Sequence, residues 1–208
     1  MAASALAASP LAASDAAAFC PDRRWPGGAF EAVQLGVDRW PQGDMIDLRL
    51  DDGSQVMMRL ADVLPAGPGR PGARVQASFE VQQRWAPTAG GFGVICQVDD
   101  VVVDVRVIGD QPVRPSGWRD VCPAKTLDQG FLEGLYLGAG VCDSDTCQTS
   151  FRLEDGIEVH LHSSPGQAWK LFGPPGRLVR AEYELRNRWL KEPMCWHPRR
   201  LTGGRPLR

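Results

Sequence analysis

An eleven-residue stretch occurs twice in this chain, 104 residues apart. Val75–Trp85 reads Val-Gln-Ala-Ser-Phe-Glu-Val-Gln-Gln-Arg-Trp, and Val179–Trp189 reads Val-Arg-Ala-Glu-Tyr-Glu-Leu-Arg-Asn-Arg-Trp. In both copies apolar and polar residues alternate, which is the period of a β-strand with one face buried and one face in water. A repeat of about 100 residues in a chain of 208 therefore predicts two copies of a small β-module.

Further landmarks recur at nearly the same offset. A Cys-Pro pair begins at Cys20 and another at Cys122, and a Gly-interrupted apolar strand follows each, over 28–36 and 130–138. Glycine inside a strand is typical of the bulge with which a strand bends around a small barrel. Asp-Gly turns between alternating runs, at Gly53 and Gly156, predict a tight hairpin in each copy.

The order of elements in each copy is strand, hairpin, connection, strand, loop and strand. This order resembles the OB fold, which implies an all-β protein of two tandem five-stranded Greek-key barrels, each with at most a short helix before its fourth strand. An SH3-like barrel is the alternative. We expect the first barrel over 19–110, a linker over 111–117, the second barrel over 118–201 and a loose tail over 202–208.

Residues 1–18 are small and mildly apolar, and we interpret them as a signal peptide or a disordered Ala-rich segment. No Lys or Arg precedes the apolar part, which departs from the usual signal peptide. No other run reaches the ~20 apolar residues of a membrane span. We therefore expect a periplasmic or secreted protein with no integral membrane segment in the mature chain.

Six cysteines in an exported chain favour disulfides. The duplication selects the pairs, because Cys20 and Cys96 hold the places in the first copy that Cys122 and Cys195 hold in the second. The remaining two, Cys142 and Cys147, flank a four-residue turn of the second copy, and we expect a third disulfide there.

Cys142 and Cys147 also belong to the candidate metal site, together with His160 and His162. Imidazoles two residues apart share one face of a strand, and the hairpin carries His162 back toward Cys147, so the geometry permits a tetrahedral Zn²⁺ site. An oxidising compartment favours the disulfide instead, with both imidazoles in solvent. We predict no metal and no cofactor.

Catalytic motifs are missing from the sequence. It contains no nucleophile elbow, metalloprotease helix or phosphate-binding glycine loop. We therefore predict no catalytic residues and no enzyme. The alternative in this class is a metal-dependent hydrolase that uses His160 and His162.

Binding is the function class that remains. Trp25, Trp40 and Trp118 lie in expected turns or linkers where a barrel core does not need them, and with Arg186 and Arg188 they form the candidate binding surface. We expect an accessory, inhibitor or immunity-type protein that binds another protein in the cell envelope. A module for a small ligand or an oligosaccharide is an alternative.

Single-stranded nucleic acid is a further alternative, because OB barrels often bind it. Residues 1–111 carry nine Arg and fourteen acids, and residues 112–208 carry fourteen bases and eleven acids, so the halves lie near −5 and +3. This asymmetry is too small to imply nucleic acid, and Arg and Glu alternate on the same strand face of the second copy. We therefore do not expect nucleic acid as the partner.

Overall fold

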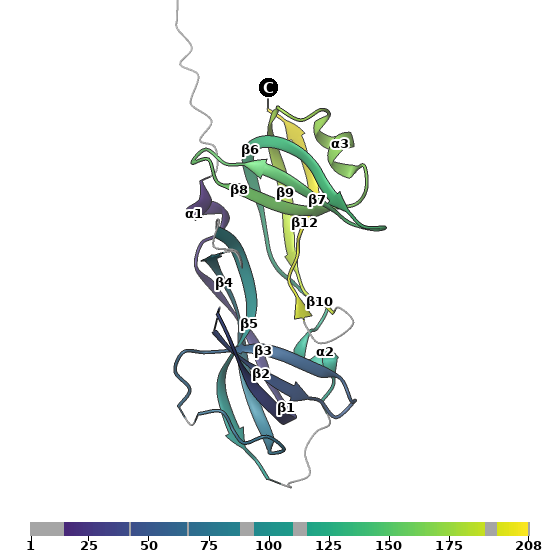
Figure 1. Cartoon of the computed structure of the whole chain (residues 1–208). Helices are drawn as coiled ribbons and strands as arrows, with labels where there is room; N and C mark the ends of the chain where they lie inside the picture. The colour runs from purple at the N-terminus through teal and green to yellow at the C-terminus, as the bar shows by residue number, and fades with distance from the viewer. Residues whose placement is uncertain are drawn as a thin grey trace, which may run out of the picture.

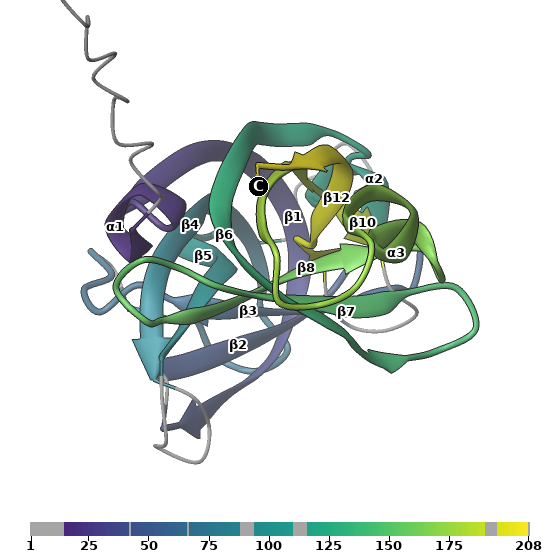
Figure 2. The ribbon, with the colours of Figure 1, turned by 90° about the horizontal axis from the view of Figure 1, so that it is seen from above.

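The structure is a computed structural model that describes residues 15–41, 43–65, 67–87, 94–109, 116–189 and 195–207. Two five-stranded antiparallel-rich sheets follow one another along the chain, and the strand pairings close each sheet on itself. The prediction of an all-β fold with two tandem five-stranded barrels is confirmed. Figure 1 shows one barrel above the other, and Figure 2 shows the second barrel lying over the first, with α1 and α2 on opposite sides.

The first barrel has the strand order β1-β2-β3-β5-β4, and β4 pairs with β1 to close it. Its strands are β1 Arg23–Trp40, β2 Gly43–Arg49, β3 Gln55–Leu60, β4 Arg74–Pro87 and β5 Val94–Val107. The contact between β3 and β5 is parallel, and the other contacts are antiparallel. The repeated stretch lies in β4, where inward residues alternate with more exposed ones, as its sequence predicts.

The second barrel repeats this order with β6, β7, β8, β12 and β9. Its strands are β6 Thr126–Cys142, β7 Cys147–Arg152, β8 Glu158–Ser163, β9 Leu178–Arg186 and β12 Arg199–Pro206, and a short pair, β10 Arg188–Trp189 and β11 Cys195–Trp196, lies beside it. The helices are α1 Ala16–Phe19, α2 Trp118–Val121 and α3 Gln167–Phe172. Helix α3 is the short helix expected before the fourth strand of the second copy.

Glycine in the first strand of each barrel makes room for the aromatic residue of the repeated stretch. A Cβ atom on Gly27 would overlap the ring of Phe79, and one on Gly130 would lie 2.9 Å from the hydroxyl oxygen of Tyr183. Phe79 and Tyr183 are the aligned aromatic residues of the two copies. Both barrels therefore use a glycine in the first strand to make room for this aromatic ring.

The two hydrophobic cores are separate, but each contains residues of the other module. Phe19 of α1 is buried among residues of the second barrel and meets Tyr183 edge-on, with ring centroids 5.7 Å apart. In the opposite direction, Val121 of α2 is buried in the core of the first barrel. The tryptophans that end the repeated stretches cross over too, because Trp85 packs on the second core and Trp189 on the first.

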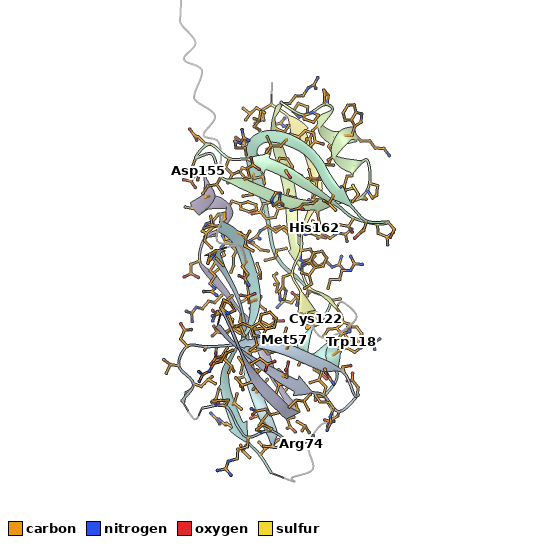
Figure 3. The ribbon with its side chains drawn as sticks, in the orientation of Figure 1. Met57, Arg74, Trp118, Cys122, Asp155 and His162 are labelled. Carbon is orange, nitrogen blue, oxygen red and sulfur yellow. A yellow bond between two sulfur atoms is a disulfide. The ribbon has the colours of Figure 1, made fainter. Side chains whose placement is uncertain are left out.

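The Asp-Gly turns hold these exchanged helices in place. Asp155, in the turn of the second barrel, accepts a hydrogen bond from the backbone N–H of Ala16 at 2.7 Å. Asp52, in the turn of the first barrel, accepts one from the N–H of Trp118 at 3.0 Å. Asp155 lies beside α1 in Figure 3, and Trp118 lies on the first barrel. Each leading helix therefore covers the barrel that it does not precede.

All three predicted disulfides are present. They join Cys20 to Cys96, Cys122 to Cys195 and Cys142 to Cys147. The first two lie where the barrels meet, because Cys20 follows α1 and Cys122 follows α2. Cys96 also packs against the core of the second barrel. These bridges therefore fasten the exchanged helices as well as tying the two ends of each module.

One boundary prediction is wrong. The segment 202–208 is not a loose tail, because β12 runs to Pro206 and pairs with β9 as far as Val179. A register shift between Leu201 and Gly203 lets the Gly-Gly pair bulge within the strand. Of the segment 1–18 the structure describes only 15–18, and Ala16 is buried there in α1. The predicted linker 111–117 lies outside the described residues except for Ser116 and Gly117.

Candidate functional site

A cleft of about 560 Å³ lies between the two barrels. The first barrel contributes Trp40, Met45 and Met57, and the second contributes His160 and His162. In Figure 3 Met57 lies at the end of the first barrel that faces the second, and His162 lies on the opposing side of the second barrel. The cleft is thus built jointly by both modules.

The walls of the cleft are equivalent surfaces of the two copies. Met57 and Arg59 of β3 occupy the positions that His160 and His162 occupy in β8. Met58 lies between Met57 and Arg59, Leu161 lies between His160 and His162, and both are buried in their barrels. Because neighbouring side chains of a strand point to opposite faces, Met57, Arg59, His160 and His162 point out of their barrels. The outer faces of two equivalent strands therefore look toward one cleft, and their side chains differ.

Apolar side chains are unusually accessible on the first-barrel side. Trp40 is 51% exposed and Ile95 is 44% exposed, and both line the cleft. Met45 and Met57 lie between them on neighbouring strands, with Met45 opposite Arg59 in the register. Large apolar residues gathered in a concave surface are typical of a binding site.

A buried ion pair lies at the base of this wall. Arg59 Nε and Asp99 Oδ2 are 3.7 Å apart, and Arg59 Nη2 donates to Gln82 Oε1 at 3.0 Å. Burial raises the pKa of Asp99, and hydrogen bonding from Gln97 and the charge of Arg59 offset this only in part. Burial likewise lowers the pKa of Arg59. Both atoms of the 3.7 Å contact lack a hydrogen-bond partner among the described residues.

Polar contacts join the barrels at the back wall of the cleft. His197 Nε2 lies 3.2 Å from Asp100 Oδ1, and His197 Nδ1 lies 3.0 Å from Asn187 Oδ1. Arg199 donates to Gln83 Oε1 and to the sulfur of Cys96. With the exchanged helices, these buried contacts make the back of the cleft a fixed junction between the modules.

Within the described chain, Asp100, Cys195 and His197 place donor atoms of the kind that bind metals within 4.8 Å of one another. The sulfur of Cys195 is bonded to Cys122, so it is no thiolate. The two donors that remain are fewer than the four ligands of a structural zinc site. This cluster is better understood as part of the junction.

The candidate metal site does not come together as a four-ligand set. Cys142 and Cys147 are bonded to each other, which removes both thiolates. His160 Nδ1 lies 3.0 Å from Ser150 Oγ, and His162 meets Trp196 edge-on with centroids 4.6 Å apart. Burial lowers the pKa of both imidazoles, which favours their neutral form. They are part of the cleft wall.

The five residues of the candidate binding surface lie apart. Trp40 lines the cleft, Trp25 packs partly buried against the first core, and Trp118 stacks on Trp189 with centroids 5.5 Å apart. Arg186 is exposed beside Glu184. Arg188 lines a small neighbouring hollow with Cys142, Asp143 and His162.

Sequence reasoning did not select Met45, Met57, Ile95 or Asp99 as site residues. A signal for two of them is present in the sequence, because Met45 and Met57 take outward positions in strands whose inward positions are Ile46, Val56 and Met58. An apolar residue on the wet face of a strand is a candidate contact. No such signal marks Ile95 and Asp99 in the sequence, because whether their side chains reach the cleft depends on where β5 leaves the barrel.

No described helix has the length and apolar character needed to cross a membrane. No protein-family model matches the chain, and no curated protein matches it. Among solved structures, one described as "Structural mimicry for functional antagonism" matches over 88% of this chain and 92% of its own, at 8% sequence identity. The TM-score of that match is 0.24, which is too low to support a shared fold or function.

Proposed function

We propose that this chain is an exported, non-catalytic binding protein whose inter-barrel cleft holds a segment of a partner protein in the cell envelope. The observation that carries this proposal is the accessible apolar wall formed by Trp40, Met45, Met57 and Ile95. Aromatic side chains are common anchors of protein interfaces, and Met adapts its shape to a partner surface. Buried contacts between the modules, such as His197 with Asp100, form the back of the cleft.

The resemblance to the OB fold supports the location of the site. OB barrels use the face of their second and third strands to bind ligands. Here Met45 and Met57 lie on the corresponding face of the first barrel, and His160 lies on that of the second. Both faces border one cleft, so a single ligand can touch both modules.

Three disulfides fit an oxidising compartment, which supports export. Because Asp15 accepts a hydrogen bond from the N–H of Ala18 and Ala16 is buried, the fold favours leader cleavage before Asp15 over cleavage after Ala18. N-terminal sequencing of protein recovered from the periplasm or medium tests this. Recovery of the uncleaved chain from the cytoplasm, with free thiols, would contradict export.

The partner is tested with a photo-crosslinking amino acid at Met57 and, as a control, at Trp169, which is 61% exposed on α3 and does not line the cleft. We expect a discrete adduct with one envelope protein from position 57 alone. The purified partner should then bind about tenfold more weakly to Trp40→Ala, the loss of roughly 1.4 kcal/mol, and equally to Trp169→Ala.

Two outcomes would contradict this function. Equal crosslinking from both positions would mean that the cleft is not the interface. Tight binding of an oligosaccharide or single-stranded nucleic acid that Trp40→Ala abolishes, with no protein adduct, would assign the cleft to that ligand class instead.

A further inference from the structure

One edge of strand β5 borders the cleft. Six consecutive residues, from Ile95 to Asp100, line the cleft. A strand that presents one face to a cavity contributes every second residue, because successive side chains point to opposite faces. Consecutive lining residues therefore indicate that one side of the backbone itself borders the cleft.

The pairing pattern agrees. β5 pairs with β4 over its whole length, from Val94 to Val107, but with β3 only at Val101 and Val102. On the side away from β4, Val94–Asp100 has no strand partner among the described residues. The long ends of β4 and β5 leave the first barrel here and reach toward the second, as Figure 1 shows.

The direction of the free backbone groups follows from one hydrogen bond. The N–H of Ala61, just beyond β3, donates to the carbonyl of Val102 at 2.9 Å, so the backbone groups of Val102 point toward the β3 side. These directions alternate along a strand, and the register with β4 has no shift between Val94 and Val102. The N–H and C=O groups of Cys96 and Val98 therefore point away from β4, toward the cleft, whereas Asp100 is buried against His197.

An open strand edge is a template for another strand, and proteins usually protect it with Lys, Pro or a covering loop. This edge carries Val94, 46% exposed, and Ile95, 44% exposed. Peptides that add to such an edge bind through backbone hydrogen bonds, and their alternate side chains enter pockets beside the strand. Met57 and Trp40 provide apolar surface of this kind across the cleft.

We propose that the segment held in the cleft is an extended peptide that adds as a strand to the open edge of β5, with apolar side chains at alternate positions. This deepens the proposed function and rests on it. The peptide's backbone pairs with Cys96 and Val98, and its apolar side chains lie against Met57 and Trp40.

The test uses an octapeptide of alternating Lys and Val, with an octapeptide of alternating Lys and Ser as the control that lacks apolar side chains. Amide hydrogen exchange is followed by NMR on the full chain. Without peptide, the N–H groups of Cys96 and Val98 should exchange fast and those of Ile95, Gln97 and Asp99 slowly, because the latter pair with β4. The Lys-Val peptide should slow exchange at Cys96 and Val98.

The matched variants are Val98→Pro and Val98→Ala. Proline removes only an N–H that faces the cleft, and it is tolerated on the open side of an edge strand. The Lys-Val peptide should bind Val98→Pro about tenfold more weakly than Val98→Ala, as expected for one lost buried hydrogen bond. Thermal unfolding and thiol counting check that both variants fold.

Equal binding to both variants, or exchange protection without the alternating pattern, would overturn strand addition and leave the cleft as a partner site. Equal or tighter binding of the Lys-Ser peptide would overturn the contact of apolar side chains with Met57 and Trp40. If Val98→Pro fails to fold, the exchange pattern of the unmodified chain decides alone. Absence of the partner adduct from position 57 bears instead on the proposed function, so the two failures are distinguishable.

Discussion

The two modules are alike where they join and unlike where they face the cleft. Asp52 and Asp155 hold the exchanged helices in the same way, and Trp85 and Trp189 each pack on the opposite core. At the cleft, Met57 stands where the other copy has His160. The duplication has thus kept the contacts that assemble the pair, and the copies differ on the surface that a ligand would touch.

The shared junction makes the barrels interdependent. Phe19 precedes the first barrel in the sequence but is buried in the core of the second barrel. Val121 precedes the second barrel but is buried in the core of the first. A change in one module should therefore be felt in the other, and the following experiments test how far this exchange extends.

The largest effect is expected from the junction disulfides. Replacing Cys20 and Cys96 with Ser should lower the free energy of unfolding by about 4 kcal/mol, because the bridge closes a long loop, whereas replacing Cys142 and Cys147 should cost about 2 kcal/mol. Urea denaturation measures both values. Equal losses would show that loop closure does not set the contribution of these bridges.

Phe19→Ala should come next, with a loss of about 3 kcal/mol from the cavity it leaves. Hydrogen exchange should rise first in β9 of the second barrel, where Tyr183 loses its partner ring. Val121→Ala is the matched change and should loosen the first barrel by a smaller amount. If hydrogen exchange in Phe19→Ala rose only in the first barrel, this would contradict the packing of α1 on the second barrel.

The turn aspartates should have a smaller effect. Asp155→Ala removes the hydrogen bonds that this carboxylate accepts from the N–H groups of Ala16 and Ile157, and it should cost about 2 kcal/mol, roughly 1 kcal/mol for each bond. Asp52→Ala should cost a similar amount through Trp118, if the two junctions are energetically equivalent. Thermal unfolding of both variants measures this. A difference well beyond the experimental error would show that the copies have diverged here too.

The smallest effect concerns the imidazoles that only the second module has. Burial lowers the pKa of His162, and the nearby His160 adds to the effect, so the unfolded chain binds a proton at higher pH than the folded chain. Stability therefore falls as pH is lowered from 7 toward 5. His162→Gln should lose less stability over this range than the unmodified chain.

Met57→Gln is the control for this pH experiment, because it changes the equivalent wall of the first module without changing a group that titrates. It should keep the pH dependence of the unmodified chain, as measured by urea denaturation at pH 7 and pH 5. An identical pH dependence in His162→Gln would mean that cleft burial does not perturb this imidazole.

Much of the fold follows from the sequence, because alternation, Asp-Gly turns and paired cysteines are local or repeated signals. They predict both barrels and the bridges Cys20–Cys96 and Cys122–Cys195. The course of β12 was missed because Gly203 and Gly204 resemble a loose tail until their pairing with β9 is seen.

The cleft could not be predicted in the same way. It depends on how two modules dock, and the alternation that buries Leu161 says nothing about what His160 faces. The position of Phe19 is a similar case, since the predicted boundaries place it at the start of the first barrel. Only its packing beside Tyr183 identifies it as part of the second core.

The crosswise placement of α1 and α2 bears on how such a chain could arise. A polypeptide with one copy would leave its barrel uncovered by its own helix, and it could cover it only by trading helices with a second identical molecule, as in a swapped homodimer. The present protein has the form of that swapped dimer in a single polypeptide, so its two halves can carry different side chains on their cleft faces.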